Sequence, residues 1–530
     1  MAYLKLTGGK IYDPDSGVDG EVKDIWIRDG KICNPPTSDN TDPIRKIDLA
    51  GRVIFPGGID MHCHIAGPKV NNARKMQPEQ TRITNSPGTN LASVPDIFTA
   101  GMRYTGQGYT TCFDAAVTPL ACRHVHHELS QVPNVDKGFY VLVGNNHRVM
   151  QRIAKNDQAG LESFLLWLLA RTGGYAPKLV NPGGVEMWKQ RASGNAKDLD
   201  GIIAGFDVTP RQIVLALATA GNNLNLPHPI HIHCNNLGIP GNASTSLETM
   251  RTVDGLKAHF AHIQFHSYGG EGEKAADMRS DVQTLAAVIN DNPNLTVDVG
   301  QVMFGETTSM TGDGPLGYFL HSIGGQRWFS ADIEMESGCG VSPIKYRNKN
   351  LVHALQWAIG LEWYLMVRDP WQVVMSTDHP NGGSFLAYPQ IIRLLMDSGY
   401  RKEALQQVNP QARKRTQLAD LDREYTLQEI ATITSAGPAR ILGLANKGRL
   451  TESADADITV YTPDKNYQTM FTWPNMVIKA GEVIVENGEF RNQTIGNTHR
   501  AITDPESRNN EEIEKWFDDH YSFSAKNFGI

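Results

Sequence analysis

Residues 53–64 read VIFPGGIDMHCH, an apolar run that ends in two histidines, His62 and His64. Side chains two apart on a β-strand point to the same side, so both imidazoles can bind one metal ion. Such a pair alone is a weak indication, because two partly exposed histidines at a strand end need no metal. Further strand-like runs that end in histidine or aspartate follow in this chain, and they favour a metal site.

Seven more apolar runs follow this stretch and alternate with helical segments. The eight runs are residues 53–64, 110–117, 139–145, 176–181, 230–235, 259–265, 295–303 and 372–378. Strands that alternate with helices indicate a parallel sheet, and eight of them fit an α/β fold with a TIM-like (β/α)8 barrel. The polar ends of the runs would then meet at one mouth of the barrel, where this fold carries its active sites.

Both ends of the chain have a different sequence pattern, in which short runs of alternating apolar and polar residues are separated by turn residues. These strands are expected at residues 3–6, 10–12, 24–27, 31–32, 456–461, 476–481 and 482–488. We expect one small β-sandwich domain built from residues 1–52 and 446–498, with the barrel and its long insertions at 53–445. The tail at 499–530 is either a helix packed on the barrel or a contact for another subunit.

The composition excludes several classes of partner. The chain has 530 residues, 40% of them hydrophobic, and a net charge of -7 with scattered Lys and Arg. Neither nucleic acid nor an anionic membrane is therefore predicted as a partner. The longest apolar stretch, residues 164–170, is too short to cross a bilayer, and the start of the chain has no apolar signal segment, so a cytoplasmic location is expected. Six cysteines without a CxxC pair indicate free thiols.

Four long connections interrupt the barrel pattern, at residues 67–95, 182–207, 305–347 and 382–426. Loops of this length in a compact domain usually carry function. We expect them to build a deep substrate channel.

The later strand ends supply further metal-binding side chains. Lys178 would lie inside the barrel on the fourth strand, where a lysine is costly as a cation. The fifth strand reads His231-Ile232-His233, the sixth carries histidines at 259, 262 and 266, and Asp378 ends the eighth. Together with His62 and His64 these residues offer ligands for two metal ions.

This pattern resembles the binuclear amidohydrolase superfamily. More narrowly, the stretches VNPGG (180–184), HIHCNNLG (231–238), QFHSYG (264–269) and STDHPNGG (376–383) resemble the A subunit of formylmethanofuran dehydrogenase. They also resemble its bacterial counterpart, the A subunit of the formyltransferase/hydrolase complex of methylotrophs. The resemblance covers nearly the whole chain, and the sequence looks closer to the bacterial branch.

The resemblance implies that Lys178 is carboxylated on its side-chain nitrogen and bridges two metal ions. The sequence assigns His62, His64 and Asp378 to the first ion. It assigns one histidine from each of strands five and six to the second. His233 is preferred over His231, and His262 over His259, because they lie nearer the mouth. The resemblance to related hydrolases also favours His262 over His266, which already lies in the loop. Zinc is favoured, and manganese or iron less so. Asp378 would be the catalytic base and then the acid.

The remaining polar residues near the strand ends have two open interpretations. They would orient a formamide or its tetrahedral oxyanion, or they would cap strand ends. These residues are Asn145, Asn146, His147, His231, Asn235, Asn236, His266 and His379. Asp114 is ambiguous in the same way, and a loop-bracing hydrogen bond is the preferred role for it.

The implied function is hydrolysis of an N-formyl methanofuran or methylofuran coenzyme to formate and the free amine. Its partners would be homologues of the B and C subunits of the dehydrogenase, together with a formyltransferase subunit. The same site could instead condense formate with the amine, as in an archaeal-type complex with a tungsten or molybdenum subunit. A hydantoinase-like activity is less favoured, and a non-catalytic scaffold is the alternative from another class.

Overall fold

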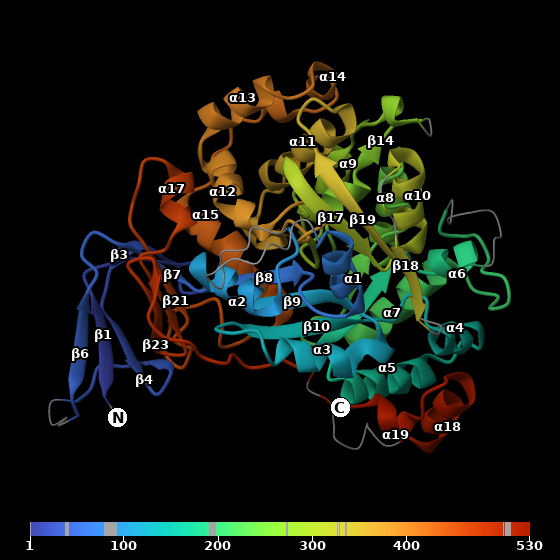
Figure 1. Ribbon diagram of the computed structural model, residues 1–530, viewed down its shortest axis with the longest axis horizontal. Coiled ribbons are helices and arrows are strands. Elements are labelled where there is room, and N and C mark those ends of the chain that lie inside the picture. Colours follow the sequence, from blue (N-terminus) through green and yellow to red (C-terminus); the bar gives the residue numbers. More distant parts are fainter. Residues whose placement is uncertain are drawn as a thin grey trace.

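Eight parallel strands form the central sheet of the computed structural model. The structure describes residues 2–37, 42–78, 93–189, 198–271, 274–325, 327, 329–333, 337–501, 503 and 510–530. In sheet order the strands are β20 (Val373–Val374), β16 (Leu295–Asp298), β13 (Ala258–Phe260), β12 (His231–His233), β11 (Ala176–Val180), β10 (Asp136–Leu142), β9 (Tyr109–Val117) and β8 (Gly58–Cys63). The sheet confirms the expected α/β fold with a TIM-like barrel (Figure 1).

The first and last strands of this sheet are joined beyond their regular ends. The His64 backbone N–H donates to the carbonyl oxygen of His379 at 2.7 Å. The Ser376 hydroxyl donates to the His62 carbonyl at 3.1 Å. These bonds bring the ends of β8 and β20 together at the barrel mouth, where the predicted ligands lie.

The run 53–64, expected as one barrel strand, is two strands in two sheets. β7 (Val53–Pro56) pairs with β2 (Lys10–Asp13) and β21 (Ile458–Tyr461) outside the barrel, and β8 starts after Gly57. A Cβ atom at Gly57 would lie 2.3 Å from the Thr110 hydroxyl oxygen, so the chain can pass from one sheet to the other only with glycine there. The barrel therefore begins at β8 rather than at residue 53.

Strands from both ends of the chain form two further sheets, which lie together at one end of the molecule (Figure 1). One has the order β5 (Lys31–Cys33), β4 (Ile25–Arg28), β1 (Tyr3–Thr7) and β6 (Ile44–Asp48). The other has the order β24 (Glu489–Phe490), β23 (Glu482–Glu486), β22 (Met476–Lys479), β21 (Ile458–Tyr461), β7, β2 (Lys10–Asp13) and β3 (Val18–Val22). One apolar cluster, which includes Leu6, Ile27 and Ile458, holds the two sheets together.

Helices surround the barrel sheet, and their apolar faces form one large core with it. The longer helices are α2 (Ile97–Gly106), α5 (Gln158–Thr172), α7 (Pro210–Asn223), α8 (Ala243–Thr252), α9 (Val282–Asp291), α10 (Gly314–Gly324), α11 (Leu351–Met366) and α18 (Glu511–His520). The shorter ones are α1 (Pro68–Met76), α3 (Cys122–Leu129), α4 (His147–Ala154), α6 (Gly184–Lys189), α12 (Tyr388–Met396), α13 (Ser398–Gln406), α14 (Pro410–Arg413), α15 (Leu427–Ala431), α16 (Gly437–Leu442), α17 (Tyr467–Thr472) and α19 (Ala525–Phe528).

The C-terminal tail packs on the barrel through α18. Trp516 and Phe517 contact Phe164 and Trp167 of α5, and Figure 1 shows the last two helices beneath α5. The acidic start of α18 also reaches basic side chains, since Glu512 forms an ion pair of 2.5 Å with Arg148. The tail thus covers an apolar helix of its own chain, and a contact with another subunit remains a prediction.

One of the long insertions meets the barrel mouth. The segment 305–346 contributes α10 and the three-stranded sheet of β17 (Gly305–Thr311), β19 (Ser337–Tyr346) and β18 (Phe329–Ile333). Residues 79–92 and 190–197, within two other expected loops, lie outside the described residues.

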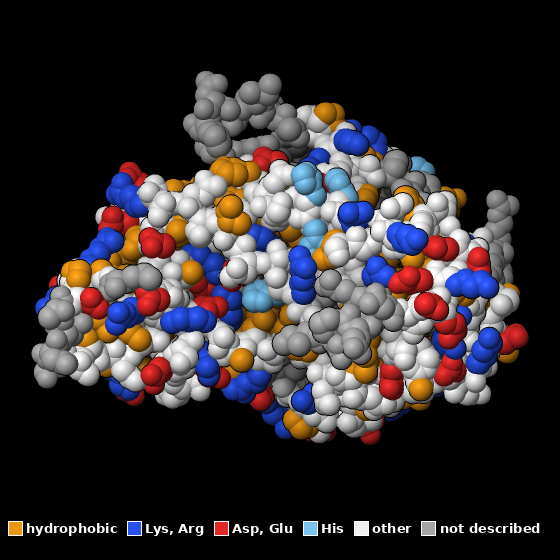
Figure 2. Space-filling view, turned by 90° about the horizontal axis from the view of Figure 1, so that it is seen from below, with side chains coloured by type: hydrophobic (Ala, Val, Ile, Leu, Met, Phe, Trp, Pro, Cys, Tyr) orange, Lys and Arg blue, Asp and Glu red, His pale blue; other side chains and the backbone are white. Residues whose placement is uncertain are grey.

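On the face drawn in Figure 2, histidine side chains reach the surface in a central band, with Lys and Arg side chains on either side.

Five cysteines are described, and all are free thiols, which agrees with the sequence. Cys63 donates from its sulfur to the Phe113 carbonyl at 3.3 Å and packs in the core, as expected for a residue that faces away from the metal ligands. In the described part of the chain, no helix has both the length and the apolar character needed to cross a bilayer.

Candidate metal centre

The first and last barrel strands bring three predicted ligands together. Nε2 of His62 lies 3.1 Å from Oδ1 of Asp378, and Nε2 of His64 lies 3.0 Å from the same oxygen. All three side chains are buried, with exposed fractions of 1–4%. Burial alone would raise the pKa of Asp378, but the imidazoles of His62 and His262 hold it well below its usual range. The carboxylate is therefore ionised and faces two imidazole nitrogens, as a metal site requires.

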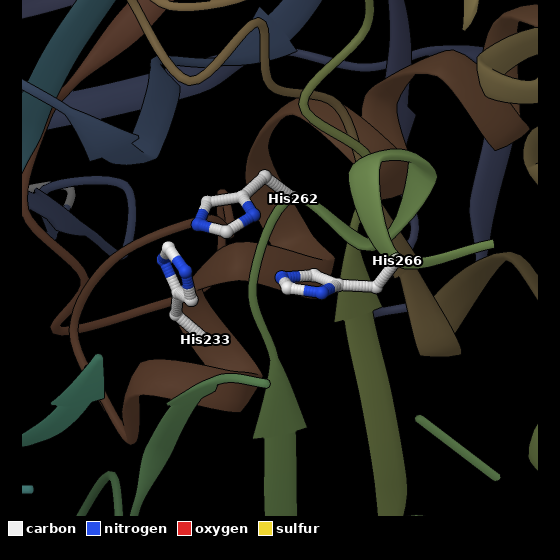
Figure 3. Close-up of side chains that lie close together, drawn as sticks. All are labelled: His233, His262 and His266. Carbon is white, nitrogen blue, oxygen red and sulfur yellow. The ribbon is translucent and has the colours of Figure 1, made fainter. Parts of the chain in front are cut away.

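A second group consists of three imidazoles from strands β12 and β13 and the turn after them. Ring nitrogens of His233, His262 and His266 lie within 4.8 Å of one another, and Figure 3 shows the rings converging on a common space. His262 has a left-handed backbone, with φ of 33°, and His266 follows in the 3-10 turn η3 (Ile263–His266). Burial lowers the pKa of His262 and of His266 well below the usual value, so both rings are neutral and can act as ligands.

Lys178 extends from β11 into the same cavity as these ligands. Its ammonium nitrogen is buried and has no hydrogen-bond partner among the described residues. Burial lowers the pKa of Lys178 to about 7, against the opposite influence of Asp298 and Asp378. A buried lysine ammonium without a hydrogen-bond partner destabilises the folded protein. The site is therefore suited to a chemical change that removes the positive charge of Lys178.

A layer of buried polar groups lies beneath the first ligand group, and the sequence interpretation missed its central member, Asp298. Oδ2 of Asp298 lies 2.8 Å from Nδ1 of His62 and 3.1 Å from Nε2 of His259. His231 belongs to this layer too, because its Nε2 faces Nδ1 of His62 at 3.1 Å and its Nδ1 faces His228 at 3.0 Å. Both ring nitrogens of His231 therefore face other histidines, in the layer below the barrel mouth. Asp298 ends strand β16 and lies inside the expected run 295–303, where a charged residue in an otherwise uncharged stretch was the signal for it.

The predicted asparagines brace loops rather than line the cavity. Asn145 donates to the Val180 carbonyl at 2.8 Å, and Asn235 donates to Asn181 at 2.8 Å. Asn146 caps α4, and Asn236 donates to Thr245 at 3.2 Å. Their described contacts favour the capping interpretation over substrate contact.

The remaining expected residues also lie outside the cavity lining. His147 lies 3.3 Å from Glu186, and His379 packs its ring against Phe385. Asp114 accepts the backbone N–H groups of Ile65 and Ala66 at 2.9 and 3.0 Å. These two bonds brace the loop after β8, the role preferred for Asp114 from the sequence.

A cavity of about 410 Å³ leads from the ligand groups toward the surface. Its lining near the site includes His62, His64, Lys178, His233, His262 and Asp378. Its walls are largely apolar, with Leu237, Phe265, Leu316, Phe319 and Ile344, and its lining also includes the cations Lys69, Lys345 and Arg347. The insertion at 305–346 supplies much of this wall, which agrees with the expected channel.

A comparison with known families decides the classification. The model of the amidohydrolase family matches residues 45–485 of this chain. The protein is an amidohydrolase. Its barrel, its paired histidines at the end of β8 and its aspartate after β20 are the features that the sequence resemblance predicted.

Individual relatives of this amidohydrolase cover its whole length. It is 40% identical to protein FwdA of Methanocaldococcus jannaschii, over 100% of this chain and 97% of that one. It is 34% identical to the A subunit of the formyltransferase/hydrolase complex Fhc of Methylorubrum extorquens, over 99% of this chain and 96% of that one. The higher identity is to the archaeal protein, so these two comparisons do not favour the expected bacterial branch.

Solved structures agree with this relationship. The crystal structure of the FhcABCD complex of Methylorubrum extorquens with methylofuran contains a chain that matches this amidohydrolase with a TM-score of 0.92. The two are 32% identical, over 100% of this chain and 96% of that one. A D-hydantoinase matches with a TM-score of 0.51 at 14% identity, over 94% of this chain and 99% of that one, and shares the fold alone.

Proposed function

We propose that this amidohydrolase holds two zinc ions in its barrel mouth and hydrolyses the N-formyl carbon–nitrogen bond of a methanofuran-type coenzyme. The observation that carries the proposal is the convergence of two separate ligand groups on one cavity that also contains Lys178. His62, His64 and Asp378 would hold the first ion, and His233 and His262 the second. Imidazole and carboxylate donors without thiolate suit zinc, and suit manganese or iron less well.

Carboxylation of Lys178 would complete both metal sites. With a pKa of about 7, much of this amine is neutral near neutral pH, and a neutral amine can add to CO2 and release a proton. The reaction converts a buried cation into an anion. An ammonium group would be repelled by two divalent cations, whereas a carbamate offers one oxygen to each of them.

The proposed reaction converts R–NH–CHO and water into formate and R–NH3+. Bound zinc would supply Lewis-acid chemistry, which polarises the formyl carbonyl and acidifies the attacking water. Asp378 would hold the first ion through Oδ1, which faces both histidines, and would accept the proton of that water on Oδ2 and deliver it to the nitrogen of the leaving amine. Its low pKa supports the first role, because the carboxylate is ionised before the water arrives.

The cavity supports a substrate with an apolar reactive end. Leu237, Phe265 and Ile344 are suited to an aromatic ring, and Lys345 and Arg347 would attract an anionic tail. The Fhc relative was crystallised with methylofuran, and its chain matches this one over the full length. We therefore assign a methylofuran- or methanofuran-type coenzyme as the substrate.

We also propose that this chain works in the cytoplasm, and the relatives support an assembly of several different subunits. The related chain of Fhc belongs to the complex FhcABCD. By this similarity, the partners of the present chain would be homologues of the other Fhc subunits, with a formyltransferase subunit among them. Its role would lie in one-carbon metabolism, in the release of formate from a formylated coenzyme.

Formate condensation is the second candidate, as the resemblance of the sequence to the A subunit of formylmethanofuran dehydrogenase implies. The same donor set serves both directions by microscopic reversibility, so the partner subunits would decide between them. A scaffold without activity is less well supported, because a scaffold has no need of histidines, a buried lysine and an aspartate at five separate strand ends.

Metal content and formate release from the N-formyl coenzyme test this proposal on the purified complex. We expect about two zinc ions per chain and formate production in the parent protein, and loss of both in Lys178→Ala. Lys137→Met is the matched control, because Lys137 is also a buried barrel lysine but binds the Gly496 carbonyl at 2.6 Å, away from the site. Unchanged formate release in Lys178→Ala, or no metal in the parent protein, would contradict the proposal.

A further inference from the structure

One buried carboxylate, that of Asp298, contacts both metal-binding groups. Its Oδ2 lies 2.8 Å from Nδ1 of His62, in the first group. Its Oδ1 accepts the backbone N–H of His262, in the second group, at 2.9 Å. Asp298 itself is fully buried at the end of β16 and does not line the cavity. It therefore touches two proposed ligands without reaching the substrate.

The contact with His62 fixes which ring nitrogen is available for metal. An ionised carboxylate can only accept hydrogen bonds, so Nδ1 of His62 carries the proton. In a neutral imidazole the lone pair is then on Nε2, the nitrogen that faces Asp378 at 3.1 Å. A carboxylate behind a metal-binding histidine also makes the ring a stronger donor.

The neighbouring imidazoles have hydrogen bonds that fit the same assignment. His259 can donate from Nε2 to Asp298 and accept the Thr296 hydroxyl at Nδ1, 2.9 Å away. His231 can donate from Nδ1 to His228, which donates to the Ile441 carbonyl at 3.2 Å. Each of these three rings is satisfied as a neutral group. The layer therefore needs no metal of its own and serves as a support.

The contact with His262 supports a backbone that is strained. His262 has φ of 33°, a conformation that non-glycine residues adopt at a cost. Gly300, two residues after Asp298, packs so closely that a Cβ atom there would lie 2.4 Å from Cβ of His262. The segment 298–300 thus holds His262 from both sides, by a hydrogen bond and by direct packing.

We infer that Asp298 is the shared positioning residue of the dinuclear centre, which orients His62 through its ring and His262 through its backbone. The inference rests on the proposed function for the metal itself. Asp298 also brings negative charge beneath a site that would receive two divalent cations, and in a buried setting that charge is weakly screened. Loss of a supporting partner of this kind typically weakens metal binding 10–100-fold.

Zinc affinity of Asp298→Asn, measured by chelator competition on the purified complex, tests the inference. We expect affinity to fall about 10–100-fold at one or both sites, with an altered visible spectrum of the cobalt-substituted protein. Asp136→Asn is the matched control: this aspartate is also fully buried, but it pairs with Lys479 at 2.6 Å and Lys447, away from the site. The control should lose stability and keep the zinc affinity of the parent.

A second pair of variants covers the case in which Asp298→Asn does not fold. His259→Gln keeps an amide donor for Asp298, whereas His259→Leu removes it. We expect zinc to be released to chelator several-fold faster from the leucine variant than from the glutamine variant. Equal release from both would overturn the inference, as would parental zinc affinity and cobalt spectrum in a folded Asp298→Asn.

The outcomes for Asp298 and for the proposed function are separable. If the parent binds zinc and releases formate while Asp298→Asn binds zinc equally well, the function stands and the role of Asp298 is refuted. If the parent binds zinc without releasing formate, and Asp298→Asn binds it more weakly, the positioning role stands and the proposed reaction is refuted.

Discussion

The carboxylate of Asp313 lies 3.4 Å from Nε2 of His233, through Oδ2. Asp313 is fully buried at the N-terminus of α10, and its other oxygen accepts the amide of Asn181 at 3.0 Å. The insertion at 305–346, which lines the cavity, therefore contacts His233, a proposed ligand of the second ion, through Asp313. The sequence interpretation did not include Asp313, because it lies in an insertion rather than at a strand end.

Asp313→Asn is expected to reduce formate release by about tenfold, because His233 loses the anionic neighbour that faces its Nε2 and orients its ring. The measurement is the steady-state rate together with zinc content. Ser322→Ala, which removes an exposed hydrogen bond to the Tyr318 carbonyl on the same insertion, serves as the control and should change the rate less than twofold. Equal rates in both variants would exclude a role for Asp313.

Recovery of activity by metal-free protein should depend on CO2 and on pH. Carboxylation needs the neutral amine of Lys178, whose pKa is about 7, so the neutral fraction rises as pH increases. Between pH 6 and pH 8 that fraction grows from about one tenth to about nine tenths. At a fixed concentration of dissolved CO2, reconstitution with zinc should accelerate by a similar factor. Recovery that is independent of bicarbonate would contradict carboxylation of Lys178.

Leu316→Trp should block the cavity without disturbing the metal ligands. Leu316 lines the apolar wall and belongs to the insertion rather than to the barrel. We expect a raised KM, or complete loss of formate release, at unchanged zinc content. Leu215→Trp on α7, where the side chain is exposed, is the matched control and should behave like the parent. Parental kinetics in Leu316→Trp would show that the substrate enters by another route.

Acid should weaken the contact between the barrel and the terminal strands. Burial alone would raise the pKa of Asp136, but Lys479 and Lys447 hold it below its ordinary value. The stability from this carboxylate is therefore complete above about pH 4 and is lost as pH falls toward the folded-state pKa. Asp136→Asn should lower the free energy of unfolding at pH 7 by about 3–5 kcal/mol. The difference from the parent should shrink toward pH 3 in denaturant titrations. A constant difference would contradict this linkage.

The barrel and the first ligand group were predictable because they follow from local periodicity. Histidines two apart at a strand end, as in His62 and His64, share a side wherever that strand lies. The division of residues 53–64 into two strands was not predictable, because Gly57 marks it only through contact with Thr110, far away in the sequence.

The supporting residues were harder to predict than the ligands. Asp298 was visible as a polar strand end, but its link to His62 and His262 depends on the closed barrel. His266 was placed in a loop and set aside as a ligand, yet the turn η3 returns its ring to His233 and His262. Such contacts arise from tertiary packing, and the spacing of residues along the sequence does not predict them.

The joining of β8 to the segment after β20 has a consequence for biosynthesis. His62 and His64 leave the ribosome early, whereas Asp378, which shares their site, is synthesised more than three hundred residues later. Under the proposed function, an unfinished chain would bind zinc only loosely through its first histidines, and tight loading would wait until the last barrel strand has docked. Metal acquisition would in that sense be a late step of maturation, and a truncated chain would not retain the ion.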